Sequence, residues 1–441
     1  MSLDILRDGS WLTRSRLRLW ASGVLIAAAA GLVFLFATAH GLNDYKGRPL
    51  GTDFSNIYVA GTLALEGHPE APYDPSAQHA RAQALFGAET PAYRWHYPPF
   101  FHFVAAVLAT MPYLVSLAVW QGVTFLLYLL AIRSILGSSP CPESTRAATA
   151  YGSTTDGADG RGGGRDGGAS RLLPRHQAIV FLLALAFPAV FVNVGHGHNG
   201  LLTAALIGFA LVLLDRRPIA AGILFGLLAY KPQFGLMIPL VLLATGRWRT
   251  IFAAAATGVA MVVAVTFVFG IDTWRAFLDF TATSRPMIEN GDAGWPLIQS
   301  PFGALRMLHA PLPLAYAGQG AVTLAIAASL VWLWRSQADD TLKAAALCLG
   351  TLLATPYCLD YDMTVLAPAI AFFSLHGLRR GFGPYEITAL SALWAVPLVA
   401  RSTAQFTLIP LGAIVMLSML FVVLRRARGD LAMAAMLAPA E

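Results

Sequence analysis

The segment LWASGVLIAAAAGLVFLFATA, residues 19–39, decides the class of fold. It contains no charged residue, and Arg14, Arg16 and Arg18 lie just before it. An apolar run of about 20 residues is long enough to cross the ~30 Å hydrocarbon layer of a bilayer as a helix. The letters FATA near its end could pass for a cleavage site, but the run is long for the apolar region of a signal peptide. We therefore expect a retained membrane anchor.

The composition of the whole chain extends this expectation from one span to many. Of the 441 residues, 56% are hydrophobic and only 12% are charged, whereas soluble proteins have about 25% charged residues. The sequence therefore predicts an all-α polytopic membrane protein with a bundle of about twelve transmembrane helices. The predicted spans are residues 19–39, 113–136, 176–194, 198–214, 217–230, 232–246, 250–270, 312–335, 341–357, 362–377, 384–401 and 404–424.

Residues 97–112, YPPFFHFVAAVLATMP, do not fit this series. After the two prolines only about 14 residues are mostly apolar, which suits a helix in the membrane interface better than a span. With this helix on the outer surface, most of the 30 Lys and Arg fall on the cytoplasmic side, as the positive-inside rule requires. The net charge of +6 therefore reports membrane topology and does not indicate a nucleic-acid partner.

The same topology divides the chain into five parts. They are a cytoplasmic tail (1–18), the first spans with a long outer loop at 40–112 (19–136), a flexible Gly/Ser-rich cytoplasmic linker (137–175), the remaining spans with an outer loop at 271–311 (176–424), and a second cytoplasmic tail (425–441). The Gly, Pro and Asn content of the second outer loop predicts a loop that can close over a cavity. The three cysteines provide neither a disulfide framework nor the spacing of a metal site.

An acid lies directly outside the first predicted span, in GTDFSNIYVAG, residues 51–61. The sequence that follows is typical of a helix. Asp53 could be the N-cap of this helix and accept hydrogen bonds from backbone amides, although Thr52 could cap it equally well. Alternatively, Asp53 could be a general base that activates an alcohol at the mouth of a membrane cavity. Asn56 shares its helical face, whereas Tyr58 points elsewhere.

The main basic candidate is in AYKPQFG. Lys231 lies between two short apolar runs, where a lysine is costly and usually functional. Pro232 breaks the helix and frees backbone groups that can line a polar cavity. Lys231 either extends to the membrane surface or meets the phosphate of a lipid. In TPYCLDYDM, Asp360 or Asp362 could orient a basic partner such as Lys231, or both could simply mark the polar end of a span.

Further residues on the predicted outer side are candidates for substrate contacts. His96 could bind a phosphate or a sugar hydroxyl, and Arg285 in the second outer loop could support a phosphate charge. In VNVGHGHNG, His196 and His198 could bind a sugar or a phosphate, or could only stabilise a turn; a metal site needs a third ligand, and none is evident nearby. The candidate substrate-binding set is Tyr58, Tyr97, His196, His198, Asp360 and Asp362.

The order of these segments resembles glycosyltransferase family 87, which is part of the GT-C fold class of membrane transferases that use polyprenyl-phosphate sugars. The resemblance is carried by TDFSNIYVAG, GHPEAPYDP, YPPFFHF, KPQ and TPYCLDYD, all on the predicted outer side. It covers most of residues 20–425, apart from the inner linker. The chain departs from the family pattern in its Gly-rich insert and at GHGHNG, where relatives often have a Gln-containing turn.

This resemblance implies a GT-C-like bundle with interfacial helices in the first outer loop, a lipid-linked hexose donor, commonly polyprenyl-phosphate mannose, and no metal or other cofactor. It also implies that the acid of the first outer loop, Asp53 here, is the catalytic base. We expect Lys231, helped by Arg285 or His96, to balance the phosphate charge during a single displacement that inverts the anomeric configuration. The acceptor would be a glycolipid or polysaccharide at the periplasmic face of a bacterial inner membrane.

Two other functions fit many of the same observations. A flippase or transporter of lipid-linked sugars would also contain many spans, but transporters often consist of repeated halves with sites near the midplane. No internal repeat is evident, and the candidate groups collect on one side, which favours an enzyme that works at the membrane surface. A polysaccharide ligase would use similar donors but would transfer a glycan rather than a single sugar.

Overall fold

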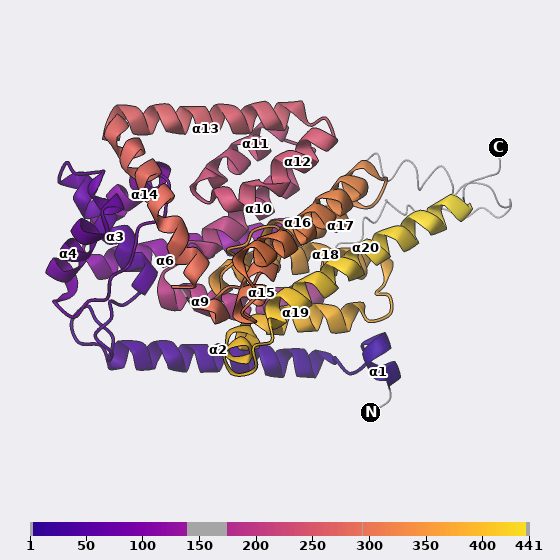
Figure 1. The fold of residues 1–441 in the computed structure, drawn as a ribbon. Coiled ribbons are helices and arrows are strands. Elements are labelled where there is room, and N and C mark those ends of the chain that lie inside the picture. The colour runs from indigo at the N-terminus through magenta and orange to yellow at the C-terminus, as the bar shows by residue number, and fades with distance from the viewer. Residues whose placement is uncertain (1–2, 139–173, 293, 438–441) are drawn as a thin grey trace, which may run out of the picture.

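The computed structural model describes residues 3–138, 174–292 and 294–437. Within these ranges the protein is helical, with isolated β-bridges and no strand. Figure 1 shows an elongated bundle in which α3 and α4 lie at one end and both termini at the other. Most of the predicted linker falls on residues 139–173, outside the described part. The predicted all-α architecture is therefore confirmed for the described ranges.

The bounds of the helices follow the apolar segments of the sequence. They are α1 (Leu3–Asp8), α2 (Arg14–Ala37), α3 (Thr52–Leu65), η1 (Ala71–Tyr73), α4 (Pro75–Phe86), η2 (Pro99–Phe101), α5 (His102–Ala109), α6 (Tyr113–Gly137), α8 (Pro174–Leu185), α9 (Pro188–His196), α10 (Gly200–Leu213), α11 (Pro218–Leu227), η3 (Leu228–Tyr230), η4 (Pro232–Gly235), α12 (Met237–Ala244), α13 (Trp248–Phe269), α14 (Ile271–Asn290), η5 (Trp295–Leu297), α15 (Pro301–Met307), α16 (Leu312–Arg335), α17 (Asp340–Leu353), η6 (Asp360–Val365), α18 (Leu366–Arg380), α19 (Glu386–Thr407) and α20 (Leu411–Leu437).

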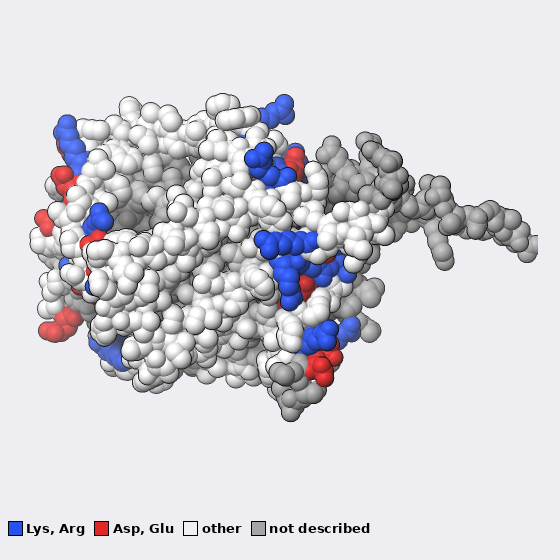
Figure 2. Space-filling model, turned by 45° about the vertical axis from the view of Figure 1, so that its right-hand side comes forward, with Lys and Arg blue, Asp and Glu red and all other residues white. Residues whose placement is uncertain are grey.

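Six helical segments of the described chain are long and apolar enough to cross a membrane: α2, α6, the α8–α9 segment over Ala178–His196, α13, α16 and α19. In Figure 2 the charged side chains lie toward two ends of the molecule and leave a wide uncharged band between them, as expected for a protein surrounded by lipid. The number of about twelve crossings is not confirmed. All twelve predicted segments contain helix, but α10, α11 and α12 have only 14, 10 and 8 residues, because Gly and Pro interrupt them.

The first outer loop is mostly helical. The helix predicted after Asp53 is confirmed as α3, and the segment 97–112 forms only η2 and the short helix α5. The two helices α3 and α5 pack closely at Gly61, where an added Cβ would lie 2.1 Å from the carbonyl oxygen of Ala105. No residue larger than glycine fits there without displacing the backbone, so Gly61 fixes the position of α3.

The second outer loop differs from its prediction. Residues 271–290 form the helix α14, whose ring side chains Phe277 and Phe280 lie 5.6 Å and 6.2 Å from the ring of Tyr73 in the first outer loop. The prediction of a closing loop was wrong for this part. The Gly and Pro residues that indicated a loop are concentrated after Asn290, whereas the preceding residues place aromatic side chains at helical spacing.

Three interruptions of the helices meet inside the bundle. The turn between α9 and α10 has Gly197 with a φ of 68°, the α11–α12 segment breaks at Lys231, and η6 lies between α17 and α18. The Asn193 amide donates a hydrogen bond of 2.8 Å to the carbonyl oxygen of Tyr361, and an added Cβ on Gly200 would lie 2.7 Å from that oxygen. The broken segments are therefore packed against one another and bring their polar groups together.

Candidate active site

The centre of the site is a buried ion pair between Lys231 and Asp362. The Lys231 Nζ lies 2.6 Å from Asp362 Oδ1, and the two side chains are 4% and 1% exposed. The other carboxylate oxygen accepts a 3.1 Å hydrogen bond from the backbone amide of Leu359. Lys231 therefore does not extend to the membrane surface. The prediction that one of the two aspartates orients Lys231 is confirmed for Asp362, as expected for a charge that is buried only with a partner.

Aromatic rings enclose the Lys231 ammonium group. Its Nζ lies 5.4 Å from the ring centre of Phe234 and 5.5 Å from that of Tyr361. These distances are within the range in which a cation is attracted to a ring face. The break after Tyr230 therefore holds Lys231 in one place, between an acid and two rings.

Asp53 is not the N-cap of α3. The cap position is Gly51, which has a φ of 71° and no side chain to accept a hydrogen bond. Thr52 does not cap the helix either, because its hydroxyl lies 2.8 Å from His196 Nδ1. The Asp53 carboxylate has no hydrogen bond or ion pair within the described residues, although the side chain is partly buried. The capping interpretation is wrong, and the carboxylate is available to a ligand.

Burial and nearby charges raise the proton affinity of Asp53. Burial is the largest cause and raises its pKa to about 7, the negative charge of Asp360 is the next, and Asp362 adds to the effect. The positive charge of Lys231 opposes them. These interactions place Asp53 near the Lys231–Asp362 pair although the three residues come from distant segments. A carboxylate with this pKa can take up a proton close to neutral pH.

A second charged contact lies beside Asp53. Arg401 Nη1, on α19, lies 3.7 Å from Asp360 Oδ2, and the other oxygen of Asp360 accepts a 2.8 Å hydrogen bond from the backbone amide of Tyr361. The Arg401 side chain is 49% exposed, whereas that of Asp360 is 8% exposed. Arg401 was not among the predicted site residues. The signal that could have indicated it is an arginine near the end of an otherwise apolar helix.

Two of the predicted substrate-binding side chains contact each other beside this centre. The Tyr97 hydroxyl lies 3.3 Å from His198 Nε2, and the His198 ring stacks on Tyr361 with 3.5 Å between the ring centres. Burial, followed by the charge of Lys231, lowers the pKa of His198 well below its usual value. A neutral His198 can exchange hydrogen bonds with a sugar hydroxyl but carries no charge to meet a phosphate. The described residues contain no group of three side chains suited to a metal.

Three predicted site residues lie in other surroundings. Arg285 forms a 2.8 Å ion pair with Glu289, and its side chain is 69% exposed. His96 is exposed, and its ring centre lies 5.3 Å from that of Phe280. The Tyr58 hydroxyl donates a 2.9 Å hydrogen bond to the carbonyl oxygen of Met111. None of the three has a contact with Asp53 or Lys231 within the described residues. The structure therefore does not bring Arg285, His96 or Tyr58 into the central cluster.

A comparison with known protein families identifies the class of this site. Residues 95–356, more than half of the chain, match glycosyltransferase family 87. The matched range includes Lys231 and His198 but begins after Asp53 and ends before Asp360. No curated protein and no solved structure matches the chain. Because this match covers more than half of the chain and the chain has several apolar spans, the protein belongs to glycosyltransferase family 87 and is a multi-pass membrane glycosyltransferase.

Proposed function

We propose that the protein transfers one hexose from a polyprenyl-phosphate donor to an acceptor hydroxyl, with Asp53 as the general base. The observation that carries the proposal is that the Asp53 carboxylate has no partner within the described residues and lies close enough to the buried Lys231–Asp362 pair for their charges to act on it. The transfer requires a base that deprotonates the acceptor alcohol and a cation that balances the charge of the lipid phosphate, at one site at the membrane. Mannose is the hexose that the family resemblance favours, and a glycolipid or polysaccharide is the acceptor.

In this reaction Asp53 accepts the proton of the acceptor hydroxyl. The acceptor oxygen forms a bond to the anomeric carbon, while the bond from that carbon to the phosphate oxygen breaks and the phosphate keeps the electron pair. A phosphate leaving group needs no strong general acid, so one carboxylate suffices where glycoside hydrolases use two. A single displacement inverts the anomeric carbon, so a β-linked donor gives an α-linked product.

The donor phosphate would be held by Arg401 together with Lys231. Lys231 is already neutralised by Asp362, and Arg285 is already paired with Glu289. Arg401 is half exposed and approaches Asp360 only to 3.7 Å, which leaves most of its N–H donors available. A guanidinium group matches the geometry of a phosphate with two parallel hydrogen bonds. Arg401 therefore takes the place that the sequence suggested for Arg285.

The proposal is tested with purified protein in liposomes that contain radiolabelled polyprenyl-phosphate mannose and a lipid extract as the source of acceptors. Asp53→Asn should lower turnover at least about 100-fold, because base catalysis contributes about 10²–10⁴-fold, and should leave donor binding intact. Arg401→Gln should chiefly raise KM for the donor. Glu89→Gln, at an exposed acid of the same outer loop, is the matched control.

Two results would contradict this proposal. Wild-type turnover in Asp53→Asn would show that Asp53 is not the base. A product that keeps the anomeric configuration of the donor would exclude a single displacement. An unchanged KM in Arg401→Gln would remove Arg401 from the phosphate site while leaving the role of Asp53 standing.

A further inference from the structure

A groove of about 770 Å³ runs along α16, far from the outer-loop helices that carry Asp53. Its wall on α16 consists of side chains at spacings of three and four residues, from Leu324 to Arg335, which places them on one stripe of the helix. This stripe is about 16 Å long at 1.5 Å per residue. Leu240 of α12 contributes to the opposite wall. The groove is therefore a long trough between two helices.

The shape of the trough follows from the order of its residues. Two small side chains, Ala327 and Ala328, lie between the larger Leu324 and Trp332, and they leave the middle of the stripe hollow. Leu324 is 72% exposed, and α16 is long and apolar enough to cross a membrane. An exposed apolar trough on such a helix suits a hydrocarbon chain.

The trough ends at positive charge. Arg335 is exposed and has no hydrogen bond or ion pair within the described ranges, and the guanidinium of Arg428 lies 5.2 Å from the Trp332 ring. Figure 2 shows that many Lys and Arg side chains gather toward one end of the molecule. Basic residues at the end of an apolar groove between membrane helices attract anionic lipid headgroups.

We propose that this trough binds one anionic phospholipid of the surrounding bilayer. Its acyl chain lies along the hollow at Ala327 and Ala328, and its phosphate meets Arg335, with Arg428 beside Trp332 at the same end. The charge of Arg335, which has no partner among the described residues, favours an anionic lipid over a zwitterionic one. This inference does not depend on the proposed transfer reaction.

Native mass spectrometry of the detergent-purified protein tests the inference with phosphatidylglycerol and with phosphatidylcholine of the same acyl chains. The wild type should retain one phosphatidylglycerol. Arg335→Gln should reduce the affinity roughly fivefold, as expected for one arginine at a membrane surface. Arg249→Gln, at another exposed arginine without a partner in the described structure, should retain the lipid as the wild type does.

A second pair of variants tests the shape of the trough. Ala328→Phe fills the hollow and should abolish retention even though Arg335 is present, whereas Ala325→Phe, at an exposed position of α16 outside the groove, should not. Equal retention of the two lipids would overturn the inference, as would unchanged binding in both Arg335→Gln and Ala328→Phe. A dimer that forms through this face and excludes phosphatidylglycerol would also overturn it. Transfer activity is measured in a separate assay. Its absence would contradict the proposed function and would leave the lipid-binding inference standing.

Discussion

Asp53 differs from the other acids of the site because its carboxylate has no hydrogen-bond or ion-pair partner in the part of the chain that the structure describes. Asp362 is paired with Lys231, and Asp360 approaches Arg401. Asp53 and Lys231 could be predicted because an ionisable residue at a membrane boundary is rare enough to stand out in an apolar sequence. Their proximity could not, because 178 positions separate them along the chain and only the packing of the broken helices brings them together.

The sequence could not distinguish Arg285 from Arg401 as the second cation for a related reason. Arg285 and Arg401 are equivalent by residue type, and both lie on the predicted outer side. Folding pairs Arg285 with Glu289, one helical turn away, and leaves Arg401 with a looser contact to Asp360. Whether an arginine is already neutralised depends on contacts that residue type alone does not reveal.

The charge around Asp53 predicts the pH dependence of transfer. Asp53, as the proposed base, must be ionised to accept a proton, so the rate should rise with pH through a midpoint near 7, to which burial raises the pKa of Asp53. Asp360→Asn removes a negative neighbour, lowers the pKa of Asp53 and should move the midpoint to lower pH. The measurement is kcat/KM against pH between 5 and 9. An unmoved midpoint would show that Asp360 does not act on the base, and Glu89→Gln controls for general charge effects.

At the scale of elements, the position of α3 depends on its contact with α5. The sequence predicts α3 through its apolar pattern, but it does not predict that Gly61 must accept the backbone of Ala105. The same is true of α14, whose aromatic side chains pack on the first outer loop where a loop was predicted. The local sequence pattern therefore predicts where helices such as α3 occur better than it predicts which residues form the contacts between them.

Gly61→Ala should destabilise the protein and slow transfer. An added Cβ would lie 2.1 Å from a backbone oxygen, so α3 must move and Asp53 moves with it. Overpacking of this kind costs about 1–3 kcal/mol. Thermal unfolding in detergent and turnover of the folded fraction are the measurements. Gly122→Ala, in α6 with open space at its Cβ, should leave both unchanged; equal behaviour of the two variants would argue against a tight α3–α5 contact.

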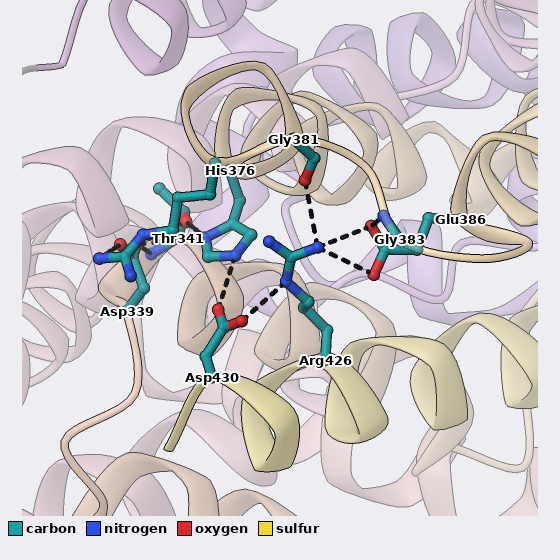
Figure 3. Close-up of polar contacts among 9 residues, drawn as sticks. Asp339, Thr341, His376, Gly381, Gly383, Glu386, Arg426 and Asp430 are labelled. Atoms are coloured by element: carbon teal, nitrogen blue, oxygen red, sulfur yellow. Dashed lines mark hydrogen bonds and ion pairs between the residues drawn. The ribbon is translucent and has the colours of Figure 1, made fainter. Parts of the chain in front are cut away.

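At the scale of the whole molecule, a second polar network lies away from the active site and joins α18, α19 and α20. His376 Nε2 lies 3.0 Å from Asp430 Oδ2, and Arg426 lies 3.2 Å from Glu386 and 3.0 Å from Asp430 (Figure 3). Within the residues predicted to be a cytoplasmic tail, 425–441, α20 continues to Leu437, and this network joins it to α18 and α19. Arg426 and Asp430 are one helical turn apart, but His376 and Asp430 are 54 positions apart and Arg426 and Glu386 are 40, so no local pattern could indicate the contacts that join the three helices.

Arg426→Met should lower the stability of the protein without changing its chemistry. It leaves Glu386, whose side chain is 2% exposed, without its positive partner. Breaking a buried pair in this way costs about 3–5 kcal/mol. Denaturation in detergent should show the loss, the double variant Arg426→Met with Glu386→Leu should recover much of it, and kcat per folded molecule should stay at the wild-type value. A lower kcat in the folded fraction would show that the two networks communicate.

The Lys231–Asp362 pair also limits which ligands can contact the amine. Because the ammonium already has a counterion at 2.6 Å, a small anion such as chloride meets no excess of positive charge at that point. A donor of the proposed kind, with its sugar against the aromatic rings and its hydrocarbon tail in the lipid, would compete with Asp362 for the amine through many further contacts. The pair therefore disfavours a small anion at Lys231 before any reaction begins.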